Sequence, residues 1–230
     1  MRTALVIGGT GDVGQGAVTA LLAKGWYVIA ASRKPEKLTK IFPEAPRFTA
    51  IAGDLSSETC AAQLWQCAIA VTGAIDAVII SVNAPIVLSP LFECTSEQLN
   101  QLFNDNVLTH FNAAKCFIPK LKPGGIFIGI GGGMADFIVP RYGHIAMGQG
   151  ALRNMYRAII KEQKNSGVII KQLLVLSVVN GASTRESAEP GWITDLDIGQ
   201  HLLAIIENTE NFSDDILKLK SRKQVGFPED

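Results

Sequence analysis

The chain has 230 residues, of which 47% are hydrophobic, and its 21 basic and 21 acidic side chains give a formal net charge of +0. A chain of this length can bury about 70% of its unfolded surface around one core, so a single domain over residues 1–230 is expected. The balanced charge, without a basic stripe or a run of like charges, argues against nucleic acid or an anionic membrane as a partner and favours a small ligand.

The first residues, MRTALVIGG, enter an apolar strand without a basic leader or a cleavage site, and no apolar stretch is long enough to span a bilayer. We therefore expect a cytoplasmic protein. Cys60, Cys67, Cys94 and Cys116 form no CxxC pair and have no metal-site spacing with histidine. This pattern predicts reduced core thiols and no metal site.

Short apolar runs alternate with segments of helical spacing along the whole chain. Continuous apolar runs are typical of strands buried on both faces, and their alternation with helices predicts an α/β fold with a doubly wound parallel sheet. The expected strands are 3–9, 27–32, 48–54, 77–83, 125–132 and 169–179, and the clearest helices are 14–24 and 95–117. The least patterned stretches, 134–144 and 181–197, are candidate substrate loops.

The first strand runs into GGTGDVGQG, which spaces three glycines as GxxGxxG at a strand-to-helix turn. Small residues there allow a tight turn, a close approach of backbone N–H groups to a pyrophosphate and close packing of the helix on the strand. A purely structural glycine-rich turn is the alternative. The predicted phosphate-binding turn comprises Gly8, Thr10, Gly11, Asp12, Val13 and Gly14.

The second and third strands end in residues suited to the rest of a dinucleotide. Ser32 and Arg33 stand where NAD-dependent proteins carry an acidic residue, and a guanidinium suits a 2′-phosphate, so the sequence predicts NADP(H). The alternative for Arg33 is a solvated surface side chain. Asp54 and Leu55 follow the third strand, where the carboxylate could hold the adenine amino group or simply form a turn.

Over most of its length the chain resembles the short-chain dehydrogenase/reductase family. The GxxGxxG turn is similar to that of its extended and atypical branches, because Asp12 stands where the TGxxxGxG form has its middle glycine. The resemblance implies a Rossmann fold, an oxidoreductase activity and cofactor contacts at Ser81 and Asn83. It also matches Asn106 to the asparagine that distorts the long fourth helix and helps to hold a water relay; a helix-surface amide is the alternative.

The family's chemistry uses a Ser that orients a carbonyl, a Tyr that donates a proton and a Lys one helical turn later. An ungapped comparison places Gly132, Ile145 and Gln149 at these three positions. None of the three can do the corresponding work, so we expect the usual mechanism to be absent. Tyr142 and His144 precede the same helix and are candidate substitute donors, with a solvated or packing role as the alternative.

Three functions therefore stay open. The first is an NADPH-dependent oxidoreductase of a small carbonyl or alcohol, with a degenerate active site and an unorthodox donor. The second is an inactive NADP(H)-binding sensor, and the third is a structural subunit that pairs with an active relative through the long fourth and fifth helices. The family's helices commonly form dimers or tetramers, which implies a homo-oligomer.

Overall fold

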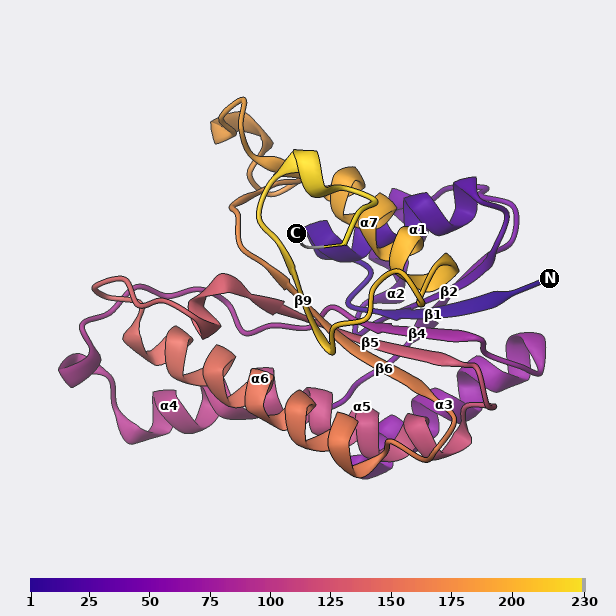
Figure 1. Ribbon diagram of the computed structural model, residues 1–230, viewed down its shortest axis with the longest axis horizontal. Helices are drawn as coiled ribbons and strands as arrows, with labels where there is room; N and C mark the ends of the chain where they lie inside the picture. The colour runs from indigo at the N-terminus through magenta and orange to yellow at the C-terminus, as the bar shows by residue number, and fades with distance from the viewer. Residues whose placement is uncertain (229–230) are drawn as a thin grey trace.

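A seven-stranded parallel sheet forms the centre of the molecule, in a computed structural model that describes residues 1–228. Its strand order is β3-β2-β1-β4-β5-β6-β9 (Figure 1). The order reverses between β1 and β4, as in a doubly wound sheet, so the expected fold class is confirmed. The strands are β1 (Thr3–Ile7), β2 (Tyr27–Ser32), β3 (Phe48–Ala52), β4 (Ala77–Ile80), β5 (Ile126–Gly132), β6 (Ile169–Val175) and β9 (Ile216–Leu219), with a separate small pair of β7 (Val179–Asn180) and β8 (Ile193–Thr194).

Helices cover both faces of the sheet, and the sheet separates the core into two hydrophobic clusters, one on each face. One cluster lies under α1 (Asp12–Ala23), α2 (Pro35–Ile41) and α7 (Asp195–Glu207). The other lies under α3 (Glu58–Thr72), α5 (Thr109–Phe117) and α6 (Gly143–Glu162). The helix α4 (Ser96–Phe103) precedes α5 and extends beyond the sheet beside the start of α6 (Figure 1).

Two glycines let α1 and α7 pack backbone to backbone. A Cβ added at Gly16 would overlap the carbonyl oxygen of Asp195, and one added at Gly199 would overlap that of Gly16. The first turn of α7 is therefore held directly on α1. The loop that precedes α7 consequently lies beside the turn between β1 and α1.

The sequence located six of the seven strands of the central sheet, although most of them end earlier than expected. The predicted run 169–179 divides into β6 and the short β7, and the seventh strand, β9, was missed. The expected helix 95–117 is interrupted by a π-helical segment, η2 (Asn104–Leu108). Thr95 caps α4 through a reciprocal capping box with Gln98.

Two expectations about less regular parts need correction. The candidate loops 134–144 and 181–197 are not wholly irregular, because they contain the start of α6, the strand β8 and the start of α7. All four cysteines are unpaired thiols, but none is fully buried: Cys67 is exposed and the other three are half-buried. Cys116 alone among them packs against a hydrophobic cluster, the one under α3, α5 and α6.

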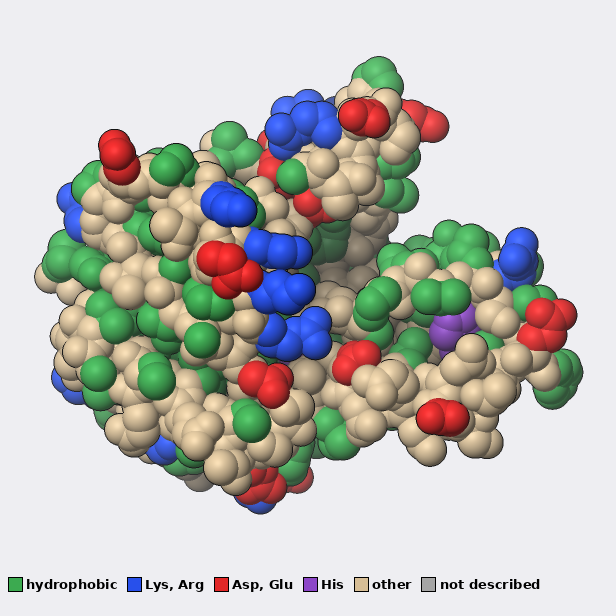
Figure 2. Space-filling view, turned by 180° about the vertical axis from the view of Figure 1, so that it is seen from behind, with side chains coloured by type: hydrophobic (Ala, Val, Ile, Leu, Met, Phe, Trp, Pro, Cys, Tyr) green, Lys and Arg blue, Asp and Glu red, His purple; other side chains and the backbone are tan. Residues whose placement is uncertain are grey.

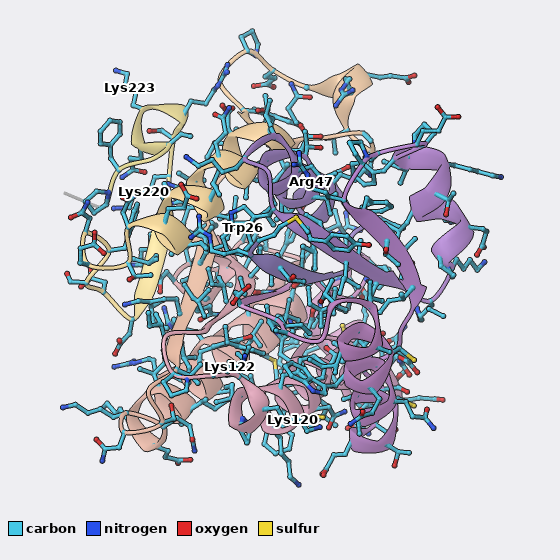
Figure 3. All side chains as sticks on the ribbon, turned by 90° about the vertical axis from the view of Figure 1, so that its right-hand side faces the viewer. Trp26, Arg47, Lys120, Lys122, Lys220 and Lys223 are labelled. Carbon is cyan, nitrogen blue, oxygen red and sulfur yellow. The ribbon has the colours of Figure 1, made fainter. Side chains whose placement is uncertain are left out.

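The two edges of the sheet differ in character. Trp26, Arg47 and Lys122 precede β2, β3 and β5 and so lie at the edge where strands begin, which faces the viewer in Figure 3. There the Arg2 guanidinium lies 4.3 Å from the centre of the buried Trp26 ring. The opposite edge, where the strands end, carries the cavity described below. Among residues 1–228, no helix combines the length and the apolar character that crossing a membrane requires.

Candidate functional site

A cavity of about 1050 Å³ runs along the carboxyl edge of the sheet, from the ends of β2 and β3 to α4 and α5. Figure 2 shows it as a hollow between the main body and a smaller lobe. Nine of the residues predicted to hold a cofactor line this cavity: Gly8, Thr10, Gly11, Ser32, Arg33, Asp54, Leu55, Ser81 and Asn83. The topology thus brings together side chains from four different strand ends.

The turn after β1 can have this shape only because it contains glycine. Gly8 has a φ of +85°, and a Cβ there would overlap the carbonyl oxygen of Ser81. A Cβ at Gly14 would overlap the carbonyl oxygen of Gly8, so the first turn of α1 lies directly against the end of β1. Gly11 is the extended N-cap residue of α1 and supplies no side-chain cap. Thr10 and Gly11 line the cavity, so the N-terminus of α1, whose first N–H groups have no partner within the helix, lies at its wall without a capping side chain.

Three residues of the predicted turn do not line the cavity. Gly14 acts by packing, and Val13 packs against the hydrophobic cluster under α1. The carboxylate of Asp12 faces the loop before α7, where it accepts hydrogen bonds from the Ser183 backbone N–H, at 3.0 Å, and from the Ser183 hydroxyl. The Asp12 side chain therefore links α1 to that loop and does not reach the cavity, where the sequence predicted it.

The rim of the cavity beside β2 is more basic than the sequence suggested. Arg33 is joined there by Lys34 and Lys37, and all three line the cavity. Figure 2 shows basic side chains in a row along the rim of the hollow. Neither Lys34 nor Lys37 was predicted; Lys34 is the N-cap residue of α2, and Lys37 lies in its first turn.

Asp54 lies near Arg33 at this rim and forms the local turn that was one of the two roles left open by the sequence. Its Oδ1 accepts a hydrogen bond from the Ser56 backbone N–H at 3.0 Å, which is a local turn. Partial burial opposes ionisation, but hydrogen bonds from Ser56 and the positive charge of Arg33 outweigh it and lower the pKa of the Asp54 carboxyl. A carboxylate that also lines the cavity therefore remains charged at neutral pH.

Asn106 lies at the centre of the π-helical segment and is buried. Its Oδ1 accepts a hydrogen bond of 2.8 Å from the Ala84 backbone N–H, which ties the helix to the segment after β4. The alternative of a helix-surface amide is therefore wrong. The wider turn of a π-helix is a common feature of functional sites.

The three positions compared with Ser, Tyr and Lys lie close together at the end of β5 and the start of α6. The Gln149 Oε1 accepts a hydrogen bond of 2.7 Å from the Gly132 backbone N–H, and its Nε2 donates one of 3.0 Å to the Asn83 Oδ1. Ile145 is buried one turn earlier on α6. The Gln149 amide therefore bridges the ends of β4 and β5, and both of its ends are bound by the protein itself.

Neither of the two candidate donors, Tyr142 and His144, lines the cavity in the part of the chain that the structure describes. His144 is buried, and its Nε2 lies 2.8 Å from the Val87 carbonyl oxygen. A carbonyl oxygen only accepts, so the Nε2 carries the hydrogen and donates it to this backbone group. Tyr142 is the half-buried N-cap residue of α6.

A buried tyrosine and histidine that were not predicted lie between α5 and α6. The hydroxyl of Tyr156, on α6, lies 2.9 Å from the His110 Nδ1, and the His110 Nε2 donates to the Val82 carbonyl oxygen at 2.9 Å. A Cβ at Gly129 would overlap the Tyr156 hydroxyl, so this glycine makes room for the pair. Burial lowers the pKa of His110 to about 4 and raises the pKa of Tyr156.

A doubly wound parallel sheet with a glycine turn after β1 and a polar cavity along its carboxyl edge defines a protein of the Rossmann class. The family model described as short chain dehydrogenase matches residues 2–189. The chain therefore belongs to the short-chain dehydrogenase family.

Similar proteins have varied names. The NADPH-dependent pterin aldehyde reductase of Arabidopsis thaliana is 23% identical over 201 residues, which are 82% of this chain and 83% of that protein. The L-xylulose reductase of Mesocricetus auratus is 31% identical over 129 residues, which are 54% of this chain and 51% of that protein. Among solved structures, an alcohol dehydrogenase from Thermococcus sibiricus complexed with 5-hydroxy-NADP has a TM-score of 0.82 and 19% identity, and covers 96% of this chain and 97% of its own. The structure of ElxO with NADP bound has a TM-score of 0.84 and 15% identity, and covers 95% of this chain and 97% of its own.

Proposed function

We propose that the protein binds NADP(H) in the cavity along the carboxyl edge of the sheet. The observation that carries this proposal is the basic rim of Arg33, Lys34 and Lys37 directly after β2, where a 2′-phosphate would find guanidinium and ammonium donors. The glycine turn fits the pyrophosphate, because Gly8 and Gly14 let the start of α1 lie directly against the end of β1, and Gly8, Thr10 and Gly11 present backbone to the cavity. The names of the plant relative and of the two solved structures, which mention NADPH or NADP, support the same cofactor.

We also propose that the protein is a degenerate oxidoreductase, which lacks the family's usual proton-transfer route. A bound nicotinamide would supply a hydride, and reduction of a carbonyl would then need a proton donor beside it. Gly132, Ile145 and Gln149 offer no such donor, since the Gln149 amide already bridges Gly132 and Asn83. Ser81 and Asn83 would contact the cofactor at the same edge. The four unpaired thiols agree with a reducing compartment such as the cytoplasm.

A second candidate is an active reductase with a substitute donor. Tyr142 favours it, because this half-buried phenol is the N-cap of α6 and stands three residues before Ile145, about one helical turn. His144 is a poorer candidate, since its N–H is donated to the Val87 carbonyl. The non-catalytic function, in which NADP(H) occupancy changes conformation or partner binding, requires no donor at all.

The experiment that tests the proposal has two stages. Titration calorimetry should show that NADPH binds more tightly than NADH, and similar affinities for the two would contradict the assignment of the 2′-phosphate to the basic rim. Turnover of a panel of aldehydes, ketones and alcohols should then stay far below an ordinary enzymatic rate of about 1 to 10³ per second. Ordinary turnover that disappears in Tyr142→Phe, with NADPH affinity unchanged, would establish the second candidate instead.

A further inference from the structure

Two loops that project beyond the sheet expose many large hydrophobic side chains. We define the apolar lobe as residues 84–92, after β4, and residues 137–140, after β5. These two segments contain no charged residue. They carry half of the exposed large hydrophobic side chains among the described residues: Ile86, Val87, Leu88, Leu91, Phe92, Phe137, Ile138 and Val139. Figure 2 shows hydrophobic side chains gathered on the smaller lobe beside the hollow.

The apolar lobe is built into the fold by specific contacts. The Ser89 backbone N–H donates to the Arg141 carbonyl oxygen at 3.1 Å, which joins the two loops to each other. The His144 Nε2 donates to the Val87 carbonyl oxygen, which joins the first loop to the start of α6. Leu91 lies beside Gly143, where an added Cβ would be in van der Waals contact with it. The exposed side chains are thus held outward by an ordered backbone.

The size of this surface exceeds what a monomer ordinarily exposes. Phe92 is fully exposed, at 104%, and Ile138 and Ile86 are 77% and 69% exposed. Together the eight residues expose on the order of 1,000 Å², whereas each partner in a standard stable interface buries roughly 800 Å². Because the two loops are joined to each other, these side chains gather on one lobe, and so large an exposed apolar area is typical of an interaction surface.

The occupant that fits is a second copy of this chain. Small molecules bind in concave pockets, but only Pro85 of the apolar lobe lines the large cavity. Permanent homodimer interfaces are richer in apolar side chains than transient ones. A two-fold axis places the same patch against itself, and an uncharged patch meets no like-charge repulsion there. The bordering residues Glu93 and Arg141 have opposite signs, so the rim adds no net charge.

We propose that two copies associate through their apolar lobes, and that this contact holds the loops beside the start of α6. It is distinct from the pairing through the long helical stretch 95–117 and the helix α6, whose exposed large hydrophobic side chains include Leu108 and Phe111. The proposal does not depend on the cofactor, because no residue of the apolar lobe except Pro85 reaches the cavity.

The test is the mass of the assembly, measured by light scattering or sedimentation at low micromolar concentration. The double variant Phe92→Glu/Ile138→Glu should halve the wild-type mass and weaken association at least about a hundredfold, since charges would face apolar groups. Phe227→Glu is the matched control, because Phe227 is 66% exposed in the C-terminal segment, and it should leave the mass unchanged. Circular dichroism and NADPH affinity should be the same in all three proteins.

Several outcomes would overturn the proposal. These are a monomeric wild type, a double variant of unchanged mass, or a mass that falls in Leu108→Glu/Phe111→Glu but not in the lobe variant. A wild type that is monomeric in solution but floats with neutral phosphatidylcholine vesicles, where the double variant does not, would assign the lobe to a membrane surface instead.

Discussion

The two ends of the carboxyl edge use their polar groups in opposite ways. Beside β1, β2 and β3, the glycine turn, Arg33, Lys37 and Asp54 all line the open cavity. Beside β5 and α6, the polar side chains are bound by the protein itself: Gln149 bridges Gly132 and Asn83, and His144 donates to Val87. The first region has groups free to bind a ligand, and the second has largely used its groups for internal structure.

This difference indicates which function the fold can still support. A dinucleotide is held mainly by backbone N–H groups and positive charge, and both are available in the first region. Proton transfer requires a donor that is free to reach the reacting atom. An amide that bridges two strand ends stabilises the end of the sheet but gives no proton. Binding without the usual catalysis is the combination that these contacts favour.

Gly14→Val should have the largest effect and would damage the first region alone. Its side chain would overlap the carbonyl oxygen of Gly8, so α1 must move away from the end of β1. We expect NADPH affinity to fall at least about a hundredfold and unfolding free energy to fall by about 1 to 3 kcal/mol, measured by calorimetry and urea titration. The control is Gly150→Ala on α6, where an added Cβ meets open space and should stabilise the helix slightly. Unchanged NADPH binding in Gly14→Val would remove the basis for a phosphate-binding turn.

The buried pair in the second region predicts that stability depends on pH. Burial lowers the pKa of His110 to about 4, whereas an unfolded histidine titrates near 6.5. Between these values the unfolded state binds a proton that the folded state does not, so stability is greatest above pH 6.5 and falls as the pH decreases toward 4. The unfolding free energy should drop by about 2 kcal/mol between pH 7 and pH 5 from this group.

In this measurement, the contribution of His201 to the pH dependence of stability must be separated from that of His110. Burial also lowers the pKa of His201 to about 4, so it contributes in the same direction. The variant His201→Gln should retain roughly half of the pH dependence of the wild type. A free energy of unfolding in His201→Gln that is constant from pH 7 to pH 5 would show that His110 is accessible to protons, and that the second region is more open than its contacts indicate.

Arg33→Ala should remove most of the preference for NADPH over NADH while leaving the second region unchanged. A lost charge-assisted hydrogen bond is worth about 1.5 to 3 kcal/mol, or about ten- to a hundredfold in affinity. Lys40→Ala is the matched control, because Lys40 is exposed on α2 but does not line the cavity. An equal loss in both variants would indicate a general charge effect, and no loss in Arg33→Ala would shift the role to Lys34 and Lys37.

The fold was largely predictable because its signals are local. Apolar runs identified the buried strands, and the glycine spacing located the turn between β1 and α1. The edge strand β9 was missed because its sequence, ILKL, has only four residues, which is too short a run to show a period. The π-helical segment was implied only by family resemblance, since no spacing in NDNVL indicates an extra residue per turn.

The site was less predictable, because its contacts join residues far apart in the sequence. Asp12 belongs to a glycine-rich motif, but its partner is Ser183. Tyr156 is recognisable only as a core residue until β5 presents Gly129 opposite it and α5 presents His110. Such pairs are set by the packing of helices on strands, which local patterns do not encode.

The last prediction concerns the smallest expected signal, a gain of activity when the second region is rebuilt. The triple variant Gly132→Ser, Ile145→Tyr, Gln149→Lys would place a hydroxyl, a phenol and an ammonium at the three positions, with the last two on one face of α6. Wild-type carbonyl reduction should be undetectable by NADPH consumption, and the triple variant should give a slow but measurable rate. The gain is limited because Lys cannot accept a hydrogen bond from the Gly132 N–H as Gln149 does, so the end of β5 loses a contact.

Single-site Ile145→Tyr is the control and should stay inactive, since its phenol would lack the ammonium that lowers its pKa. If the wild type already turns over at about 1 to 10³ per second, and Tyr142→Phe and His144→Ala leave that rate unchanged, then the comparison of Ile145 and Gln149 with Tyr and Lys is wrong and the proton comes from elsewhere in the cavity.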